Sequence, residues 1–278
     1  MEQKLADGFP QMAEYWGLLE SDFFHEIEHY SDSFVANVRQ ALRRYRHKWV
    51  LDSLHQWSRQ WEYPYVIQQV EDVVENTDQP KILDLGSGVT FLPFYLESQL
   101  RGRGEIVCSD YDASIVNIFR EVAELQGSAL RLDSEDMRHL TYAPSSFDVA
   151  YSVSVLEHTD NYEQAIQSIH GVLKPQGKLI LTFDLSRDGY DDIPLEKAHG
   201  LLQAVANSFT GFEPPSRDEL TEMANADGIL VSHEMAKHDK GLMPWVVPFV
   251  NPVRTLVRHR RVGRLYKDLT VYCLAVQK

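Results

Sequence analysis

The stretch Lys81-Ile82-Leu83-Asp84-Leu85-Gly86-Ser87-Gly88 decides the fold of this chain, because it has the pattern of a buried strand that runs into a ligand-binding loop. Its apolar residues suit a strand buried on both faces. Gly86 and Gly88 let the backbone turn sharply and approach a ligand without a Cβ in the way. Residues 91–96 follow with apolar side chains at helical spacing, so the loop opens a helix. Doubly wound α/β sheets bind their ligands at this position.

The loop departs from the fingerprint of dinucleotide-binding proteins. The third glycine of Gly-x-Gly-x-x-Gly would fall at Phe91, which is bulky. Asp84 stands just before the glycines, where it would repel a pyrophosphate and would instead suit a cationic group such as the ammonium of an amino acid. The residues therefore favour a cofactor with an amino-acid moiety over a nicotinamide or flavin.

At this point the chain resembles the class I methyltransferases, which use S-adenosyl-L-methionine and release S-adenosyl-L-homocysteine. Their first motif, hydrophobic-hydrophobic-Asp/Glu-x-Gly-x-Gly, matches Leu83-Asp84-Leu85-Gly86-Ser87-Gly88. Thr90 stands where many members carry a further glycine. The resemblance implies that the cofactor is bound by Asp84, Gly86, Ser87 and Gly88.

Residues 105–110 are predicted to form a second strand that ends in an acid. A carboxylate at such a strand end can accept hydrogen bonds from both ribose hydroxyls of a nucleoside. The resemblance gives this role to Asp110, with Asp112 as the nearby alternative, and places Tyr111 among the cofactor residues.

The family's third motif resembles the stretch from Asp136 to Asp148. The resemblance implies that Asp136 accepts from the adenine amino group and that the backbone N–H of Met137 meets the ring. Asp133 is the competing choice, because the run Asp133-Ser134-Glu135-Asp136 offers several acids.

Residues 147–152 are predicted to form the fourth strand, with Ser152 as a cofactor residue at its end, and Leu156-Glu157-His158 follows. In the family this tripeptide lies beside the sulfonium and the acceptor. His158 is the leading candidate for a general base because histidine titrates near working pH, and Glu157 is the second candidate catalytic residue. The alternative, that both only shape the cofactor pocket, stays open.

Residues 1–76 are expected to form an N-terminal helical cap or lid, and residues 77–278 the methyltransferase domain. Pro64 predicts a break before a helix over residues 66–74. Arg59 lies where small-molecule methyltransferases often place groups against the methionine carboxylate, which its planar fork could bind with two hydrogen bonds. A solvated helix residue is the open alternative for Arg59.

The resemblance implies an α/β fold with a seven-stranded, mostly parallel, doubly wound sheet in the order 3-2-1-4-5-7-6, of which the last strand is antiparallel. Residues 229–234 and 269–276 are the expected sixth and seventh strands. Acceptor-side insertions are expected at about 185–216, which is polar and rich in turn residues, and at 236–267, before the last strand.

Composition limits the partners and the compartment. Lys and Arg total 27 against 41 Asp and Glu, and the net charge of −14 disfavours nucleic acid as a substrate. Two cysteines fit a reducing compartment, and no secretory signal or apolar run of the roughly 20 residues that span a bilayer is present. We therefore expect a cytoplasmic protein without stable membrane insertion. No His, Asp and Glu set has metal-ligand spacing, so no metal is expected.

These patterns predict methyl transfer from S-adenosyl-L-methionine to an oxygen or nitrogen of a small-molecule acceptor, as in the quinone, sugar and natural-product methyltransferases that the chain resembles. Two alternatives stay open: a nucleotide-dependent oxidoreductase on a Rossmann sheet, and a non-catalytic cofactor-binding protein of the same fold. The sequence leaves the identity of the acceptor and the existence of a homodimer open.

Overall fold

A mixed sheet of seven strands forms the centre of the protein in the computed structural model, which describes residues 4–159, 161–189, 193–242 and 268–278. Five strands run parallel in the order β3-β2-β1-β4-β5. Their bounds are β1 Lys81–Leu85, β2 Glu105–Asp110, β3 Leu132–Ser134, β4 Phe147–Val153 and β5 Leu173–Ser186. The final strand, β7 (Leu269–Gln277), pairs antiparallel with β5, and the short β6 (Ile193–Pro194) pairs with the end of β5. The predicted fold class is confirmed.

The sixth strand is the one part of the predicted sheet that is wrong. Residues 229–234 make only single bridges, from Ile229 to Gln11 and from Val231 to Thr270. Helix α9 (Ser232–His238) begins within the segment, and the Ser232 hydroxyl accepts a hydrogen bond from the backbone N–H of Leu269. Because the chain turns into a helix here, it cannot continue a ladder along β7.

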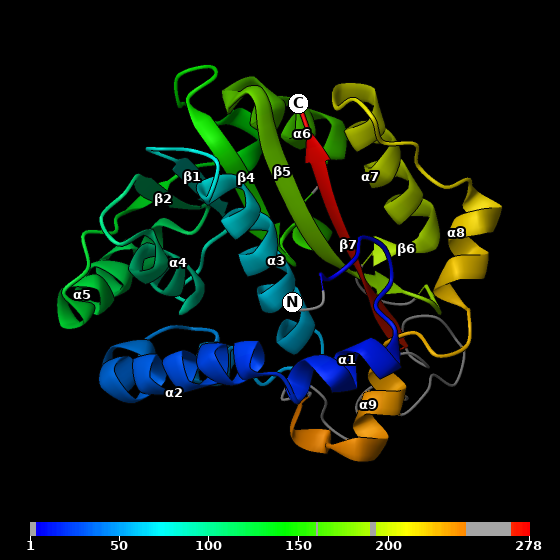
Figure 1. Cartoon of the computed structure of the whole chain (residues 1–278), viewed down its shortest axis with the longest axis horizontal. Coiled ribbons are helices and arrows are strands. Elements are labelled where there is room, and N and C mark those ends of the chain that lie inside the picture. The colour runs from blue at the N-terminus through cyan, green and yellow to red at the C-terminus, as the bar shows by residue number, and fades with distance from the viewer. Residues whose placement is uncertain (1–3, 160, 190–192, 243–267) are drawn as a thin grey trace.

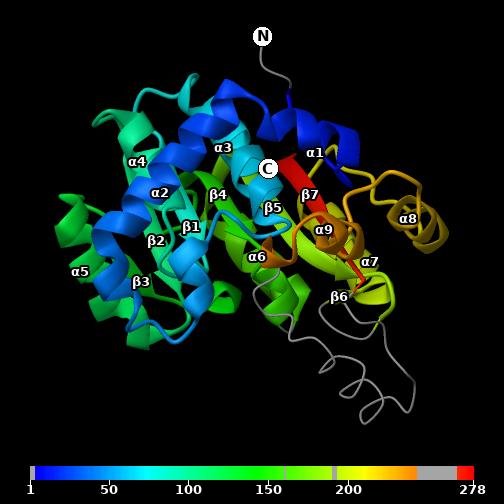
Figure 2. The ribbon, with the colours of Figure 1, turned by 90° about the horizontal axis from the view of Figure 1, so that it is seen from below.

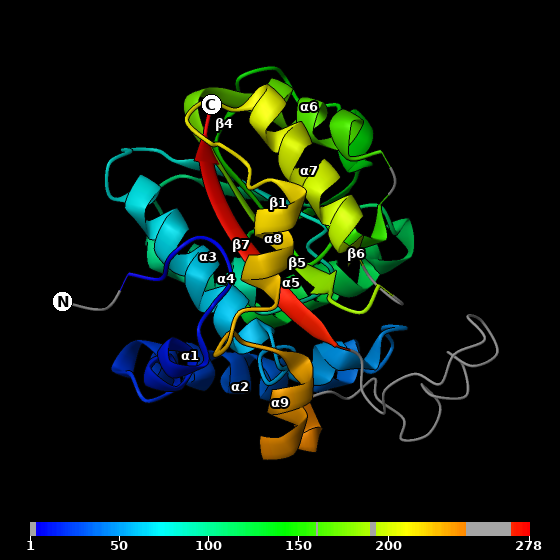
Figure 3. The same ribbon diagram turned by 90° about the vertical axis from the view of Figure 1, so that its right-hand side faces the viewer.

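Helices cover both faces of the sheet (Figure 1). One face carries α3 (Arg59–Val74), α4 (Leu92–Leu100) and α5 (Val116–Gln126), and the other carries α6 (Tyr162–Val172), α7 (Leu195–Ser208) and α8 (Arg217–Ala224). Figure 3 shows α3 and α7 on opposite sides of β5 and β7. Alternation along the strands explains the two layers, since Ile82 and Ile180 join the first apolar cluster while Leu83 and Leu179 join the second.

The first two helices lie at the end of the sheet toward which its parallel strands run. Helices α1 (Met12–Leu19) and α2 (Asp22–Leu42) share the apolar cluster of the α3 face. Figure 2 looks at this end and shows α2 crossing in front of the sheet. The segment between α2 and α3, which includes the 3₁₀ turn η1 (Lys48–Asp52), therefore reaches the carboxyl ends of the strands. The division into a cap and a domain at residues 76 and 77 stays a prediction.

Two local expectations are corrected. Helix α3 begins at Arg59 and continues through Pro64, so the proline does not break it. The helix keeps going because Trp61, Tyr65 and other side chains around the proline are buried, which offsets the missing N–H. The region 185–216, expected to be turn-rich, contains the regular helix α7, whose buried face packs on the sheet.

The insertion expected at 236–267 lies mostly outside the described residues. Within the described ranges, no helix is long and apolar enough to cross a membrane.

Candidate active site

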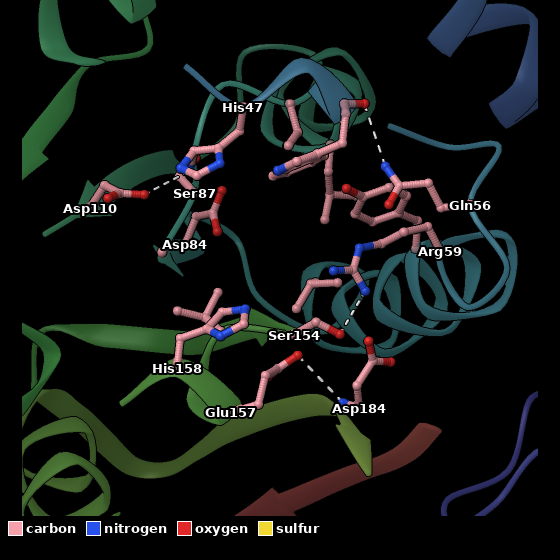
Figure 4. Close-up of a pocket in the computed structure, with 18 of the residues that line it drawn as sticks. His47, Gln56, Arg59, Asp84, Ser87, Asp110, Ser154, Glu157, His158 and Asp184 are labelled. Carbon is pink, nitrogen blue, oxygen red and sulfur yellow. Dashed lines mark hydrogen bonds between the residues drawn. The ribbon is translucent and has the colours of Figure 1, made fainter. Parts of the chain in front are cut away.

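Two cavities lie at the carboxyl ends of the parallel strands. The main cavity, of about 540 Å³, is bordered by the glycine loop, by α3 and by the turn after β4 (Figure 4). A side cavity of about 310 Å³ is bordered by the ends of β2 and by residues 135–138. Both cavities share Gly86, Asp110, Val155 and His158 in their walls. The two cavities therefore adjoin and form one elongated site.

The loop after β1 approaches its neighbours so closely at Gly86 that a side chain would not fit there. Gly86 has φ +72°, and an added Cβ would lie 2.6 Å from both methyl carbons of Val155. The backbone N–H of Gly86 donates to the carbonyl of Ser109 at 2.8 Å, which ties the loop to the end of β2. The loop thus exposes bare backbone to the cavity, as the sequence predicted.

Two carboxylates flank this loop. Asp84 is 4% exposed, and burial, with the charge of Asp110, raises the pKa of Asp84 to about 7. The Asp110 carboxylate accepts backbone N–H bonds from Gly88 at 2.9 Å and Asp112 at 2.8 Å. A bound cationic group would stabilise ionised Asp84. Asp110 is held in place at the boundary of the two cavities.

The predicted nucleoside residues Asp110, Tyr111, Asp136 and Met137 all border the side cavity. Their two alternatives point to other partners: Asp112 accepts from the Ser114 N–H at 3.0 Å, and Asp133 accepts from the Tyr142 hydroxyl at 3.0 Å. The Asp136 carboxylate is paired with the Arg138 guanidinium at 2.8 Å. This hydrogen bonding by Arg138 lowers the pKa of Asp136.

Arg59 enters the main cavity from the first turn of α3. Its Nη1 donates to the Ser154 hydroxyl at 2.6 Å and pairs with the carboxylate of Glu62. The Arg59 side chain is 14% exposed, so it is not a solvated helix residue. Glu62 is fully buried and accepts further bonds from the hydroxyls of Ser154 at 2.6 Å and Thr182 at 2.5 Å. A network from three elements thus fixes the guanidinium at the cavity wall.

Glu157 and His158 lie on the opposite side of the main cavity, in the turn η4 (Leu156–His158) (Figure 4). The backbone N–H of Asp184 donates to Oε1 of Glu157 at 3.5 Å. Oε2 of Glu157 is buried and has no hydrogen-bond partner among the described residues. Burial, and then the charge of Asp184, raises the pKa of Glu157 well above its ordinary range. Glu157 therefore favours its protonated form more than an exposed glutamate does.

Several wall residues were not anticipated from the sequence. They are Tyr45, His47, Trp49 and Gln56 from the segment between α2 and α3, together with Ser154 and Asp184. Asp184 follows the buried part of β5 just as Asp84 closes β1, and that position could have identified it. The predicted cofactor residue Ser152 is fully buried and borders neither cavity, whereas Ser154 does border the main one. In the described parts of the chain, no group of three or more His, Cys, Asp and Glu residues is arranged to hold a metal.

Sequence comparisons match part of this chain to methyltransferases. Residues 83–181 match the sequence model of a protein family described as a methyltransferase domain. The ubiquinone biosynthesis O-methyltransferase of Coxiella burnetii is 27% identical over 53% of this chain and 62% of its own length. The demethylmenaquinone methyltransferase of Thermus thermophilus is 29% identical over 36% of this chain and 46% of its own. The chain thus spans less than two thirds of these curated relatives.

Among solved structures, the [4+2]-cyclase SpnF is 20% identical, with 77% of this chain and 82% of that chain covered and a TM-score of 0.48.

Proposed function

We propose, from the premise that this chain carries the methyltransferase domain of the class I enzymes, that it transfers a methyl group from S-adenosyl-L-methionine to an oxygen or nitrogen of a small-molecule acceptor. The observation that carries the proposal is the placement of Asp84 and Asp110 at the ends of adjacent strands, on either side of a loop in which Gly86 has no room for a side chain. The natural-product, sugar or quinone-like character of the acceptor is part of the proposal.

The residues fit this cofactor group by group. Asp84, whose burial raises its pKa to about 7, suits the ammonium of the methionine moiety, and Arg59 suits its carboxylate. Asp110 suits the ribose hydroxyls, and the side cavity suits the adenine. The elongated site would then place the nucleoside in one cavity and the methionine moiety with the acceptor in the other.

The reaction needs alignment more than chemical activation. The acceptor's lone pair forms a bond to the methyl carbon while the carbon–sulfur bond breaks and leaves its electron pair on sulfur. His158 borders both cavities, and so lies near the junction of nucleoside and methionine moiety, where it can take the proton that an alcohol or phenol acceptor loses. If His158 and Glu157 only shape the pocket, the protein uses an acceptor that needs no base.

We also place the protein in the cytoplasm, acting on a small molecule and not on nucleic acid. The net charge of −14 opposes binding to phosphate backbones. Cys108 and Cys273 are both free and buried, which fits a reducing compartment. A homodimer is compatible with the proposal, and sedimentation of the purified protein would establish the oligomeric state.

Calorimetric titration with S-adenosyl-L-methionine and S-adenosyl-L-homocysteine tests the cofactor directly. We expect saturable binding of both by the native protein and a loss of about tenfold to a hundredfold in affinity for Asp110→Ala, because hydrogen bonds to a charged group are lost. Asp78→Ala removes an exposed acid ahead of β1, at the end of that strand opposite the glycine loop, and should bind as the native protein does. No binding by well-folded protein would refute the proposal.

Binding of NADPH instead would support the oxidoreductase alternative, and cofactor binding without turnover of any acceptor would support a non-catalytic protein.

A further inference from the structure

The segment between α2 and α3 brings two aromatic side chains over the glycine loop. The Tyr45 hydroxyl lies 3.7 Å, and Cη2 of Trp49 lies 4.0 Å, from the point that a Cβ on Gly88 would occupy. Both residues border the main cavity, as does His47, whose ring packs edge-on against that of Tyr45 with the centroids 5.6 Å apart. Figure 4 shows His47 on the side of the cavity where Asp110 lies. The segment therefore meets the cavity at the end where the cofactor's ribose is proposed to bind.

Tyr45 is held in place by the protein itself. Its backbone N–H donates to the carbonyl of Leu42 at 3.0 Å, at the end of α2. Its carbonyl accepts from Nζ of Lys48 at 2.8 Å. The residue is only 6% exposed, so its ring is packed on nearly all sides. The position of the hydroxyl is thus fixed by packing and does not depend on a ligand.

The hydroxyl of Tyr45 is a donor without a partner among the described residues. The charge of Asp110 acts on it, yet the Asp110 carboxylate accepts from the backbone N–H groups of Gly88 and Asp112 instead. A ligand can reach the hydroxyl, because Tyr45 borders the main cavity and the oxygen is not enclosed on all sides. Polar groups of nearly buried residues usually have a hydrogen-bond partner, so an oxygen of a ligand is the expected one.

The hydroxyl keeps its proton at neutral pH. Burial, and then the charges of Asp110 and Asp112, raise the pKa of Tyr45 to about 12, although Arg46 acts in the opposite direction. A neutral phenol beside a carboxylate can share a third group with it. A sugar hydroxyl that donates its proton to Asp110 still has lone pairs that accept from Tyr45.

We propose that Tyr45 donates a hydrogen bond to a ribose hydroxyl of the cofactor, the same hydroxyl that donates to Asp110. This inference rests on the proposed methyltransferase function. Trp49 lies over the same loop, where its apolar ring shields the bond from water. Tyr45 precedes residues 83–181, which match the family model, so recognition of the cofactor would extend beyond the matched part of the chain.

Two rival explanations give the hydroxyl a different ligand. If Tyr45 bonds to the acceptor, removal of its hydroxyl leaves the affinity for S-adenosyl-L-homocysteine unchanged. If Tyr45 bonds to the methionine carboxylate, the same change weakens the cofactor whether or not the ribose hydroxyls are present. Only a bond to the ribose makes the effect depend on a ribose hydroxyl.

The test is calorimetric titration of the full chain with S-adenosyl-L-homocysteine and with its 2′-deoxy and 3′-deoxy analogues. We expect Tyr45→Phe to bind S-adenosyl-L-homocysteine about threefold to tenfold more weakly than the native protein, as loss of an uncharged hydrogen bond predicts. For the analogue that lacks the bonded hydroxyl, Tyr45→Phe and the native protein should bind equally. An analogue that binds weakly is measured through its competition with S-adenosyl-L-homocysteine.

Tyr30→Phe is the matched control. It removes a tyrosine hydroxyl from α2 at a residue that borders neither cavity, and it should bind all three ligands as the native protein does. Equal binding of the deoxy analogue by Tyr45→Phe shows in addition that the variant is folded.

Two results would overturn the inference: undiminished affinity of Tyr45→Phe for S-adenosyl-L-homocysteine, or the same loss of affinity for all three ligands. Either result leaves the proposed function standing, because the native protein still binds the cofactor. Absence of cofactor binding by the native protein would instead refute the proposed function itself.

Discussion

Glu62 holds the guanidinium of Arg59 against the turn that follows β4. The Glu62 side chain is fully buried, and its carboxylate pairs with Arg59 while it also accepts from the Ser154 hydroxyl at 2.6 Å. Ser154 in turn accepts from Arg59 at 2.6 Å, which closes a triangle of three side chains. The arginine is thus fixed before any ligand arrives, and a ligand carboxylate would find it already oriented.

Breaking this pair should destabilise the protein. Glu62→Gln leaves a mostly buried guanidinium without its counter-charge, and we expect the free energy of unfolding to fall by about 3 kcal/mol. Urea denaturation followed by circular dichroism measures the loss. Glu222→Gln, at an exposed position of α8, should change stability by less than about 0.5 kcal/mol. Equal stability of the two variants would show that the ion pair does not contribute to the fold.

The raised pKa of Asp84 predicts a conflict between stability and binding. Its pKa is about 7 in the folded chain, raised mainly by burial from the usual 3.8, so folding favours the protonated acid. Ionisation of buried Asp84 lowers the free energy of unfolding. This loss is absent below pH 3.8, where the acid is protonated in both states, and it grows until the pH passes 7. Asp84→Asn should therefore stabilise the protein at pH 8, by on the order of 3 kcal/mol, and have little effect at pH 4. Thermal unfolding of both proteins at the two pH values measures this difference.

The same variant should bind the cofactor poorly. If Asp84 accepts the methionine ammonium, native affinity for S-adenosyl-L-homocysteine should rise as the pH increases from 6 to 8, because the ionised carboxylate is the binding form. Calorimetry in buffers of different ionisation enthalpy would detect the proton released on binding. A pH-independent affinity that Asp84→Asn retains would rule out this role.

Gly86 is required both because its φ is positive and because it lies close to Val155, and the energetic effects of these two features can be measured separately. Gly127, at the end of α5, has a similar φ of +63°, but a Cβ there meets nothing within 4 Å. Gly127→Ala should cost about 1 kcal/mol from the left-handed backbone alone. Gly86→Ala adds a Cβ 2.6 Å from Val155, and we expect a further loss of about 1 to 3 kcal/mol together with loss of cofactor binding. Equal stability of the two alanine variants would contradict the tight packing of the loop.

Much of the sheet and of the strand-end site could be predicted because local pattern and position decide them. Strands β1 and β4 are buried on both faces and show as apolar runs, and parallel connections bring their carboxyl ends to one edge. That geometry places Asp84 and Asp110 beside the same glycine loop. The ligands of these side chains cannot be deduced in this way and remain proposals.

The parts that could not be predicted depend on tertiary contacts. Residues 229–231 are apolar and partly β-branched, as in a strand, yet they reach β7 through a single bridge at Val231. The segment carrying Tyr45, His47 and Trp49 has no motif, and it meets the cavity only because α2 packs across the sheet end. Helix α7, in contrast, could have been predicted from the sequence. Leu201, Leu202 and Val205 have helical spacing, but the turn residues on either side of the helix obscured it.

His55 joins the segment between α2 and α3 to α2 and should make stability depend on pH. Its Nδ1 lies 2.7 Å from Asp52 and its Nε2 lies 3.1 Å from Glu28, with the charge of Asp32 nearby. Hydrogen bonding to Asp52 raises the pKa of His55 to about 9, against 6.5 in an unfolded chain, although burial acts in the opposite direction. The charged imidazole therefore stabilises the fold fully below pH 6.5, and this contribution disappears as the pH rises through 9.

His55→Gln removes that contribution. We expect the variant to be less stable than the native protein by about 2 kcal/mol at pH 6, after allowing for partial exposure of the ring, and equally stable at pH 10. Urea unfolding at both pH values provides the measurement. His29→Gln, at an exposed position of the same helix α2, should match the native protein at each pH. A deficit of His55→Gln that is the same at pH 6 and pH 10 would mean that the ring contributes by packing and not by charge.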